Sequence, residues 1–420
     1  MELGQLSEQA RMDALPRDWQ YYTIGQTLTL TNGLAFRPSE WKTHGTPIIR
    51  IQNLNDDNSP YNYYDGPISE KYRIRAGDIL FAWSGTTGTS FGARIWTGPN
   101  AVLNQHIFKV TPDKTKVTPY YSFLVLQNVQ KEIERQAHGF KSSFVHVKKS
   151  DLVKVCLPIP PIPEQESIGK ALSEVDQLIA NLERLTEKKQ AIKQGLTQRL
   201  LTGKTRLPGF VDEWREVKLR DEGTTYGGLV GKDKNDFGAG SASFVTFMEV
   251  MASARLLGHR LERVRVRPGE RQNQVQRGDV LFNGSSETPE EVAFASVVEF
   301  NPSPSTYLNS FCFGYRLKDT RRIDPTFLAY FFRSSNGREL VASLAQGATR
   351  YNIAKTKLLE VQPILPPVDE QRAIVEVLRD AESELAALNV RLTRVRAVKT
   401  GMMQQLLTGR TRLPVREGAA

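Results

Sequence analysis

The sequence predicts an α+β protein with two mixed α/β globular units, each followed by one long helix. Three observations lead to this prediction. Two segments of the chain recur almost letter for letter, 206 residues apart. Each recurring block encloses a long stretch with apolar residues at helical spacing. Ahead of each block lie short β-rich runs that turns of Gly, Asn, Asp and Pro separate, without a regular alternation of strands and helices.

Two short motifs define the repeat most clearly. Residues 200–208 read LLTGKTRLP and residues 406–414 read LLTGRTRLP, while PPIPEQ at 160–165 returns as PPVDEQ at 366–371. The globular parts match more loosely, for example in GDILF at 77–81 and GDVLF at 278–282. A single long repeat indicates two structural units of one type and not a solenoid. The predicted segments are a first globular domain at 1–157, a first helix at 158–208, a second globular domain at 209–363, and a second helix with a C-terminal tail at 364–420.

Apolar residues recur at steps of three and four along both predicted helices, which indicates a helical packing seam. Each helix is too long to lie on one domain of ordinary size, so we expect the two to pack against each other. Lys189 interrupts the first seam once. The expected packing residues are Ile168, Leu172, Val175, Leu178, Leu182, Leu185, Ile192, Leu196, Ile374, Leu378, Ala381, Leu385, Leu388, Leu392, Val395 and Met402.

The helix ends carry ordinary signals. Gly203 and Gly409 stand where a left-handed residue would end each helix, and Lys204 and Arg206 suit the negative end of the helix dipole. Gly195 and Gly401 lie inside the helices, where a glycine costs ~1 kcal/mol relative to alanine. We therefore expect a close helix crossing or a local break at these two positions.

The N-terminal stretch 15–19, LPRDW, is similar to the LPGFVDEW that follows the first helix. The second helix lacks such a continuation, because its LP leads only into VREGAA at the end of the sequence. We therefore expect residues 15–19 to pack near the end of the second helix.

Composition limits the classes of protein that fit. The net charge is +10, which suits a polyanionic partner such as nucleic acid but also occurs in proteins that are merely basic. Two cysteines in 420 residues argue against a disulfide frame and against a structural zinc site. The polar N-terminus is unlike a signal peptide, and no apolar run is long enough to span a membrane. We expect a cytoplasmic protein without a membrane partner.

Polar loops at matched places in both units are the candidate DNA-contacting segments. Each combines hydrogen-bond donors and acceptors with a nearby base or aromatic ring, which suits phosphates and base edges. Taken singly, each loop also has the composition of an ordinary turn. The candidate residues are Arg50, Gln52, Asn53, Ser84, Thr86, Thr87, Lys141, Ser142, Ser143, Asn283, Ser285, Ser286, Thr349, Arg350, Tyr351 and Asn352.

Catalytic patterns are not found in the sequence. The Gly203-Lys204-Thr205 run lacks the first glycine of a phosphate-binding loop, since Gln198 stands there, and it follows a helix instead of a strand. The five histidines (44, 106, 138, 146 and 259) have neither metal-ligand nor catalytic-triad spacing. No methyltransferase motif is present. We therefore expect no catalytic residue, no metal and no cofactor bound by this chain.

Together these features resemble the specificity subunit of type I restriction-modification systems. The resemblance covers nearly the whole chain and depends on the PPIPEQ and PPVDEQ helix openings, the two LLTG[KR]TRLP helix ends, the Gly-Asp-Ile/Val-Leu-Phe strands and the order of domains and helices. It implies that each globular unit is a target recognition domain for one half of a bipartite DNA site. It also implies that the two helices form an antiparallel coiled coil that sets the spacing between the half-sites.

The same resemblance implies a set of partners. These are double-stranded DNA, two methyltransferase subunits that bring S-adenosylmethionine chemistry, and in some systems two restriction subunits that use ATP and Mg²⁺. The base-reading residues of such domains vary with the target, so the DNA-contacting residues above come from loop position and chemistry alone. The alternative is a coiled-coil scaffold that joins proteins without reading DNA sequence.

Overall fold

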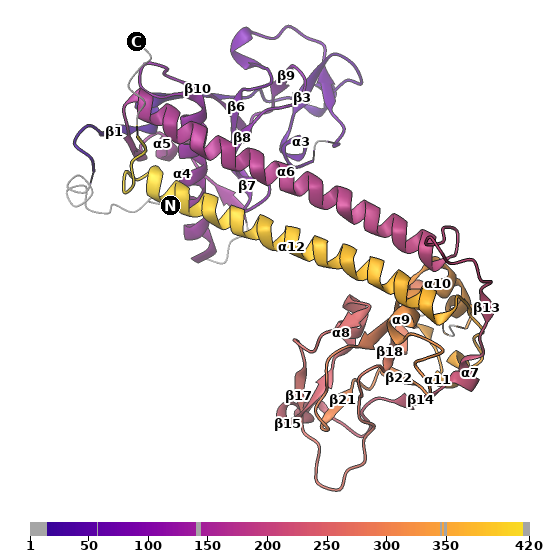
Figure 1. Cartoon of the computed structure of the whole chain (residues 1–420). Coiled ribbons are helices and arrows are strands. Elements are labelled where there is room, and N and C mark those ends of the chain that lie inside the picture. Colours follow the sequence, from indigo (N-terminus) through magenta and orange to yellow (C-terminus); the bar gives the residue numbers. More distant parts are fainter. Residues whose placement is uncertain (1–14, 57, 140–143, 345–346, 348–350, 415–420) are drawn as a thin grey trace. The chain divides into compact units, whose positions relative to one another are not determined.

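The chain forms two compact units in the computed structural model (Figure 1), which describes residues 15–56, 58–139, 144–344, 347 and 351–414. Unit 1 comprises residues 1–183 and 391–420, and unit 2 comprises residues 184–390. Each unit therefore contains one globular domain together with part of both long helices, because a boundary crosses each helix.

The globular domain of unit 1 contains two four-stranded sheets. The central sheet has the order β2-β10-β6-β8, and the second has the order β4-β3-β9-β5. Its strands are β1 (Gln20–Thr23), β2 (Leu28–Asn32), β3 (Thr46–Ile49), β4 (Asn62–Tyr64), β5 (Arg73–Ile74), β6 (Ile79–Ala82), β7 (Ser84–Thr86), β8 (Gly92–Ile95), β9 (Ala101–Leu103), β10 (Ile107–Pro112), β11 (Phe144–His146) and β12 (Cys156–Ile159). Its helices are α2 (Ile24–Thr27), α3 (Ile51–Asn55), α4 (Pro119–Gly139) and α5 (Lys149–Leu152), with 3-10 turns η1 (Pro38–Glu40) and η2 (Glu70–Tyr72).

The globular domain of unit 2 repeats this plan, with one more strand in the larger sheet and one fewer in the smaller sheet. Its larger sheet has the order β14-β22-β18-β20-β16, and its smaller sheet has the order β17-β15-β21. Its strands are β13 (Arg215–Glu216), β14 (Gly223–Gly227), β15 (Phe237–Val245), β16 (Arg255–Leu256), β17 (Glu262–Val264), β18 (Val280–Asn283), β19 (Ser285–Ser286), β20 (Ala295–Val298), β21 (Thr306–Leu308), β22 (Cys312–Leu317), β23 (Tyr351–Asn352) and β24 (Ile364–Leu365). Its helices are α7 (Leu219–Glu222), α8 (Phe247–Ala252), α9 (Pro325–Arg333), α10 (Ser335–Ala342) and α11 (Lys355–Leu358), with 3-10 turns η3 (Lys234–Asp236) and η4 (Pro289–Glu291).

The two domains share strand order and strand direction. The order β2-β10-β6-β8 in unit 1 corresponds to β14-β22-β18-β20 in unit 2. In the smaller sheets, β3 pairs antiparallel with β4 and parallel with β9, and β15 pairs in the same way with β17 and β21. The loose sequence repeat of the globular parts therefore reflects one topology used twice.

Two long helices follow the domains, α6 (Ile162–Leu201) and α12 (Val368–Leu406). Figure 1 shows α6 in magenta and α12 in yellow. Gly203 and Gly409 follow them with φ of +70° and +71°, the left-handed conformation that was expected at each helix end. The predicted fold class, two mixed α/β units that are each followed by a long helix, is confirmed.

Ion pairs show that the two helices run antiparallel. In unit 1, Asp176 pairs with Lys399 at 2.6 Å, and Glu183 pairs with Arg396 at 2.5 Å. The residue number on α12 falls as the number on α6 rises, which is the pattern of antiparallel helices.

The helix segments of unit 2 follow the same pattern. Lys189 lies 2.7 Å from Glu384, and Lys193 lies 2.9 Å from Glu382. Lys189 interrupts the apolar seam because it forms an ion pair across it. Lys193 and Lys399 are 206 residues apart, as are Asp176 and Glu382, so these two pairs are copies of each other.

The predicted packing residues differ in burial. Ile168, Leu172, Leu182, Ile374, Leu378, Leu385 and Leu392 are buried. Val175, Leu196, Ala381, Leu388, Val395 and Met402 are half-buried. Leu178, Leu185 and Ile192 remain 38, 39 and 44% exposed. These three recur every seven residues and form an exposed apolar row on α6.

The expectation for the two internal glycines was wrong. Helices α6 and α12 continue without interruption through Gly195 and Gly401. A Cβ atom built on either residue meets nothing within 4 Å. Neither a close helix crossing nor a break accounts for these residues, and both lie beside open space.

A buried glutamate at the start of each long helix ties it to the end of the other. Glu370, at the start of α12, accepts hydrogen bonds from Arg206 at 2.5 and 2.7 Å and from the indole of Trp214 at 3.3 Å. Glu164, at the start of α6, accepts from Arg412 and from Trp19 Nε1. Arg206 is therefore engaged within unit 2.

The N-terminal stretch packs at the end of α12, as its sequence predicts. Arg412 also donates to Asp18 at 2.7 and 2.6 Å. Leu15 and Trp19 belong to the same apolar core as Leu406 and Leu413. Trp19 thus has the place in unit 1 that Trp214 has in unit 2. Of the helices in the described ranges, none has the length and apolar character that a membrane crossing needs.

Candidate nucleic-acid interface

The polar loops selected from the sequence lie next to each other in each unit. In unit 1, β7 pairs antiparallel with β11, which brings Ser84 opposite His146. In unit 2, β19 pairs antiparallel with β23, which brings Ser285 opposite Asn352. We call these two short ladders, with the turn that contacts each, the ladder surfaces. Segments that are far apart in sequence meet there, and they do so at matched places.

Backbone hydrogen bonds fix three segments together at the ladder surface of unit 1. Trp83 follows the buried strand β6, and its N–H donates to the carbonyl of His106 at 3.3 Å. The N–H of Val147 donates to the carbonyl of Trp83 at 2.9 Å. The strand end, the turn between β9 and β10, and the segment after β11 therefore have fixed relative positions.

The ladder surface of unit 2 has the same frame with different side chains. Gly284 replaces Trp83, and its N–H donates to the carbonyl of Phe311 at 2.8 Å. Ile353 N–H donates to the carbonyl of Gly284 at 3.0 Å. Phe311 thus stands where His106 stands in unit 1, and its side chain is 57% exposed. A shared backbone frame with different side chains suits two domains that read different sequences.

An aromatic cluster lies at the ladder surface of unit 1. The Trp83 ring lies 5.2 Å from the His106 ring, 4.9 Å from the His146 ring, and stacks on Phe108 at 5.9 Å. Trp83 Nε1 and His106 Nδ1 are buried atoms that have no hydrogen-bond partner among the described residues. An unsatisfied buried polar atom costs ~1–3 kcal/mol, and a ligand that supplies the missing partner removes this cost.

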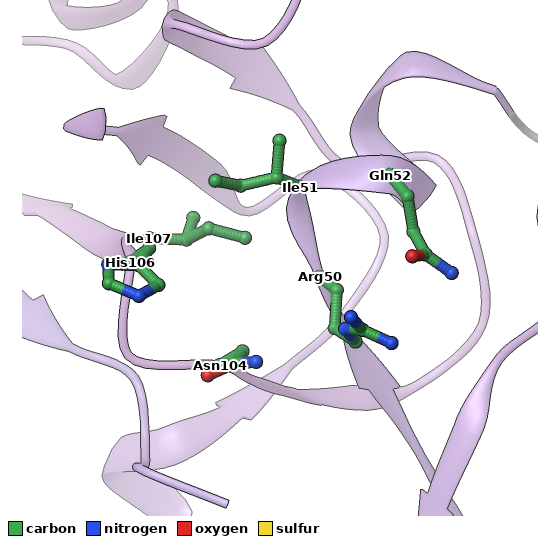
Figure 2. Close-up of a pocket in the computed structure, with 6 residues that line it drawn as sticks. All are labelled: Arg50, Ile51, Gln52, Asn104, His106 and Ile107. Atoms are coloured by element: carbon green, nitrogen blue, oxygen red, sulfur yellow. The ribbon is translucent and has the colours of Figure 1, made fainter. Parts of the chain in front are cut away.

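A hollow adjoins this cluster (Figure 2). The start of α3 contributes Arg50, Ile51 and Gln52, and the turn into β10 contributes Asn104, His106 and Ile107. The guanidinium of Arg50 lies 4.7 Å from the Trp41 ring centre, and its Nη1 donates to Asn62 Oδ1 at 2.8 Å. The stacking and this one hydrogen bond orient Arg50, whose other side-chain N–H groups have no partner among the described residues.

The chemistry of the hollow suits nucleic acid. Arginine binds guanine edges or phosphates, and asparagine and glutamine bind adenine edges through paired donors and acceptors. Arg50, Gln52 and Asn104 place these three side-chain types around one opening, as Figure 2 shows. The adjoining Trp83 is half-buried and contacts His106, which lines the hollow.

Two of the predicted residues in unit 1 are largely internal. Asn53 is 1% exposed, accepts from the Arg50 N–H at 3.0 Å and donates to the Ser59 carbonyl at 3.0 Å, so it holds the turn after α3. Ser84 is 7% exposed within its ladder. Gln52 and Thr86 are exposed, and Thr87 is half-buried. Lys141, Ser142 and Ser143 lie outside the described residues.

Unit 2 buries more of its predicted residues. Asn283 is fully buried, and its Nδ2 donates to the carbonyls of Ser285 and Glu291 at 3.2 and 2.9 Å. Ser285 and Ser286 are each 6% exposed, and Ser286 donates to the Glu291 carboxylate at 3.0 Å. Tyr351 is half-buried and Asn352 is exposed. Thr349 and Arg350 lie outside the described residues.

The sequence-based selection missed Trp83, His106 and His146. Metal-ligand spacing and triad spacing do not single out these two histidines. The repeat could have identified His106, because Leu103-Asn104 recurs as Leu308-Asn309 and aligns the turns that follow. The residues two positions after these asparagines, His106 and Phe311, differ between copies of one frame. A difference within a turn that both copies share indicates a position with a separate role in each domain.

The described residues offer no site for a resident metal. Among them, no group of three or more His, Cys, Asp and Glu side chains could hold a metal ion. Burial raises the pKa of the Cys312 thiol to about 12, so this side chain stays protonated and packs as an apolar group. Trp83 Nε1 and His106 Nδ1, two of the buried polar atoms without a partner among the described residues, belong instead to the ladder surface of unit 1.

Two related domains with matched polar surfaces and a pair of long helices define a two-part recognition protein. Comparison with known proteins agrees. The family described as type I restriction modification DNA specificity domain matches residues 16–194 and 266–394. The putative type I restriction enzyme MjaX specificity subunit of Methanocaldococcus jannaschii is 25% identical, over 95% of each chain. The type I restriction enzyme EcoBI specificity subunit of Escherichia coli is 28% identical, over 44% of this chain and 39% of its own.

Two solved structures share the fold. The type I restriction-modification S subunit from M. genitalium has a TM-score of 0.53 at 14% identity, over 96% of this chain and 98% of its own. A second solved chain, described as showing the structural basis of complex assembly and conformational transition of the type I R-M system, has a TM-score of 0.56 at 16% identity. The match covers 94% of this chain and 99% of that chain.

The matched residues make up more than half of the sequence, so the chain belongs to the family of type I restriction modification DNA specificity domains. It is a specificity subunit of a type I restriction-modification system, the non-catalytic subunit that recognises the DNA target.

Proposed function

We propose that this chain reads a bipartite DNA target, one half with each globular domain. The observation that carries the proposal is the repeated ladder surface, one backbone frame that holds Trp83, His106 and His146 in unit 1 but Gly284, Phe311 and Asn352 in unit 2. Two domains with one frame and different side chains suit two half-sites of different sequence. Residues 1–157 and 209–363 are the proposed target recognition domains.

Exposure divides the residues selected from the sequence into proposed DNA contacts and internal supports. Arg50, Gln52, Thr86, Thr87, Tyr351 and Asn352 have side chains that are at least partly accessible in the described structure. Asn53, Ser84, Asn283, Ser285 and Ser286 support the two surfaces from within. Lys141, Ser142, Ser143, Thr349 and Arg350 keep their proposed role from sequence position alone.

The spacer segments of the proposal are residues 158–208 and 364–420. A helix of 40 residues, such as α6, is ~60 Å long. Within each unit the helix segments pair antiparallel through ion pairs, and the length of such a helix pair would define an interval between two recognition domains. We propose that this interval sets the number of unread base pairs between the half-sites.

The partners of the proposal are double-stranded DNA, two methyltransferase subunits and, where the system restricts DNA, two restriction subunits. S-adenosylmethionine then belongs to the methyltransferase, and ATP with Mg²⁺ belongs to the restriction subunit. The exposed apolar row Leu178, Leu185 and Ile192 on α6 suits a helix of a partner subunit. A DNA-modifying complex of this kind would work in the cytoplasm.

Methylome sequencing tests the proposal. A host that expresses this chain with its methyltransferase partner should carry one additional adenine-methylated motif with two short defined halves around an undefined gap. A host without this gene but with the methyltransferase should lack the motif. Finding no gapped motif, or a continuous one, would contradict a bipartite target.

A further inference from the structure

The smaller sheet of unit 2 carries a row of exposed arginines on one face. From 263 to 267, the chain alternates Arg263, Arg265 and Arg267 with Val264 and Val266. Successive side chains of an extended strand point to opposite faces. Val264 is fully buried in the small core with Phe244 and Tyr307, and Val266 packs against this core. The three arginines are exposed on the opposite face. We call Arg263, Arg265 and Arg267 the arginine row.

Arg263 lies in strand β17, and Arg265 and Arg267 lie in the segment directly after it. Strand β17 lies beside β15 (Figure 1) and pairs with it antiparallel. The register of this pair shifts between Phe237 and Ala242. Beyond the strand, the Arg265 N–H donates to the Asp236 carbonyl at 2.7 Å. Gly240 lets the two strands approach, because a Cβ atom at this position would lie 2.6 Å from Arg265 Cα. Backbone contacts therefore hold the chain in place at Arg263 and Arg265.

The guanidinium groups of the row are available for a ligand. Within the described structure, neither Arg265 nor Arg267 has a side-chain hydrogen bond or ion pair, and Arg263 has only one contact, a 3.4 Å hydrogen bond to the Gly240 carbonyl. Next to the row, Arg267 and Arg271 line an open hollow. Of the two acids that line this hollow, Glu270 lies 2.5 Å from Lys232, which helps to lower the pKa of this carboxyl to about 2, and Asp236 is buried.

The equivalent strand in unit 1 has the opposite character. Strand β4 occupies the place of β17, since both pair antiparallel with the strand that runs parallel to β9 or β21. Residues 260–271 around β17 hold five arginines and two glutamates. Residues 56–67 around β4 hold three aspartates, three tyrosines and no lysine or arginine. The row is therefore a property of one domain and not of the shared fold.

We infer that the arginine row, with Arg271, is a phosphate-binding surface that grips the DNA backbone beside the half-site read by unit 2. The inference deepens the proposed function and rests on it. Exposed arginines at the ~6.6 Å spacing of alternate strand residues can contact successive phosphates of one DNA strand. Because phosphate contacts carry no sequence information, the row contributes affinity and register and not base preference. At this strand, unit 2 therefore contributes phosphate contacts that the equivalent strand of unit 1 lacks.

The test measures duplex binding by the complex of this chain with its methyltransferase partner, as a function of salt. Fluorescence anisotropy with a target duplex and a random duplex gives the slope of log affinity against log salt. Each phosphate contact contributes about 0.9 to this slope. We expect R265Q/R267Q to lower the slope by about 2 for both duplexes, and the methylated motif to stay the same. R265K/R267K, which keeps the charges, should keep most of the slope.

A matched control removes the same charge from unit 1. R73Q/R75Q deletes two exposed arginines that pair with Glu70 at 3.0 and 3.2 Å, and it should leave the slope nearly unchanged. An unchanged slope in R265Q/R267Q, with target binding intact, overturns the inference. Loss of methyltransferase binding with an unchanged slope also overturns it, and assigns the row to a protein contact. If the wild-type complex fails to discriminate the target duplex, the proposed function fails, while a lower slope of R265Q/R267Q on random duplex still supports phosphate binding.

Discussion

Glu164 and Glu370 show how single residues connect the two copies of the repeat. Each lies buried at the start of a long helix, where a carboxylate suits the positive end of the helix dipole. Each accepts hydrogen bonds from an arginine beyond the end of the other helix and from a tryptophan of the adjoining stretch. The PPIPEQ, PPVDEQ and LLTG[KR]TRLP motifs recur together because they contain the two halves of this contact.

Loss of Arg206 should destabilise unit 2 more than loss of an exposed ion pair does. Among the described residues, Arg206→Ala leaves the buried Glu370 carboxylate with the indole of Trp214 as its one remaining side-chain partner, and an uncompensated buried charge is costly. We expect the thermal unfolding midpoint to fall by several degrees. Arg321→Ala removes an exposed arginine that pairs with Asp319 and should change the midpoint little. Equal midpoints for the two variants would show that the Arg206–Glu370 contact adds no stability.

Replacing either internal helix glycine with alanine should increase the stability of the protein. Gly195→Ala and Gly401→Ala each add a methyl group where nothing lies within 4 Å, and alanine is favoured in a helix by ~1 kcal/mol. Each variant should therefore unfold at higher denaturant concentration than the wild type. Gly203→Ala is the contrast, since Gly203 has a φ of +70° and an L-residue there costs roughly 1–2 kcal/mol. A lower stability of Gly195→Ala would show that the open space beside it is not available to a methyl group.

At the scale of the helices, the sequence predicts the existence, length and mutual packing of α6 and α12, and the structure confirms them. Helical periodicity reports that an apolar stripe exists, but it does not report which neighbour covers each turn. Leu178, Leu185 and Ile192 fit the seam by spacing, yet they stay partly exposed, while Lys189 and Lys193 form ion pairs across the helix pair. The partner residues Glu384 and Glu382 lie nearly 200 positions away, so no local pattern identifies them.

Neighbouring leucines of α6 should respond differently to a charge. Leu182 is 4% exposed, and Leu182→Asp buries an unpaired carboxylate, which should lower stability by several kcal/mol. Leu185→Asp is the matched control, because Leu185 is 39% exposed and its carboxylate can stay hydrated. Denaturant unfolding should therefore separate the two variants clearly. A large loss in both would mean that Leu185 packs in the helix pair more closely than its exposure indicates.

The Leu185→Asp variant also tests whether the exposed apolar row on α6 binds a partner subunit. If Leu178, Leu185 and Ile192 receive a partner helix, Leu185→Asp should weaken assembly with the methyltransferase subunit while the isolated chain stays folded. Analytical ultracentrifugation of the two subunits measures this directly. Unchanged assembly would leave the row as surface without a role in the complex.

At the scale of the whole molecule, the repeated motifs predict two copies of one unit, but they do not predict the ladder surfaces. The loops could be selected from composition, since Ser, Thr, Asn and Gly cluster there. The side chains that complete the surface of unit 1, Trp83, His106 and His146, come together through sheet pairing and through a turn far away in sequence. Burial likewise assigns Asn53 and Asn283 to internal support, although their chemistry alone suits base contacts.

The two halves of the DNA motif should change independently. His106 and Phe311 occupy the same position of the shared frame, and each lies in a unit that has its own apolar cores. His106→Ala should therefore relax base preference in one half of the gapped motif, and Phe311→Ala should relax it in the other half. A lost base contact costs ~1–3 kcal/mol, or roughly 5- to 150-fold in preference. Methylome sequencing of hosts that express each variant with the methyltransferase measures both halves at once. A change in the same half for both variants, or an altered gap length, would contradict separate reading by two domains.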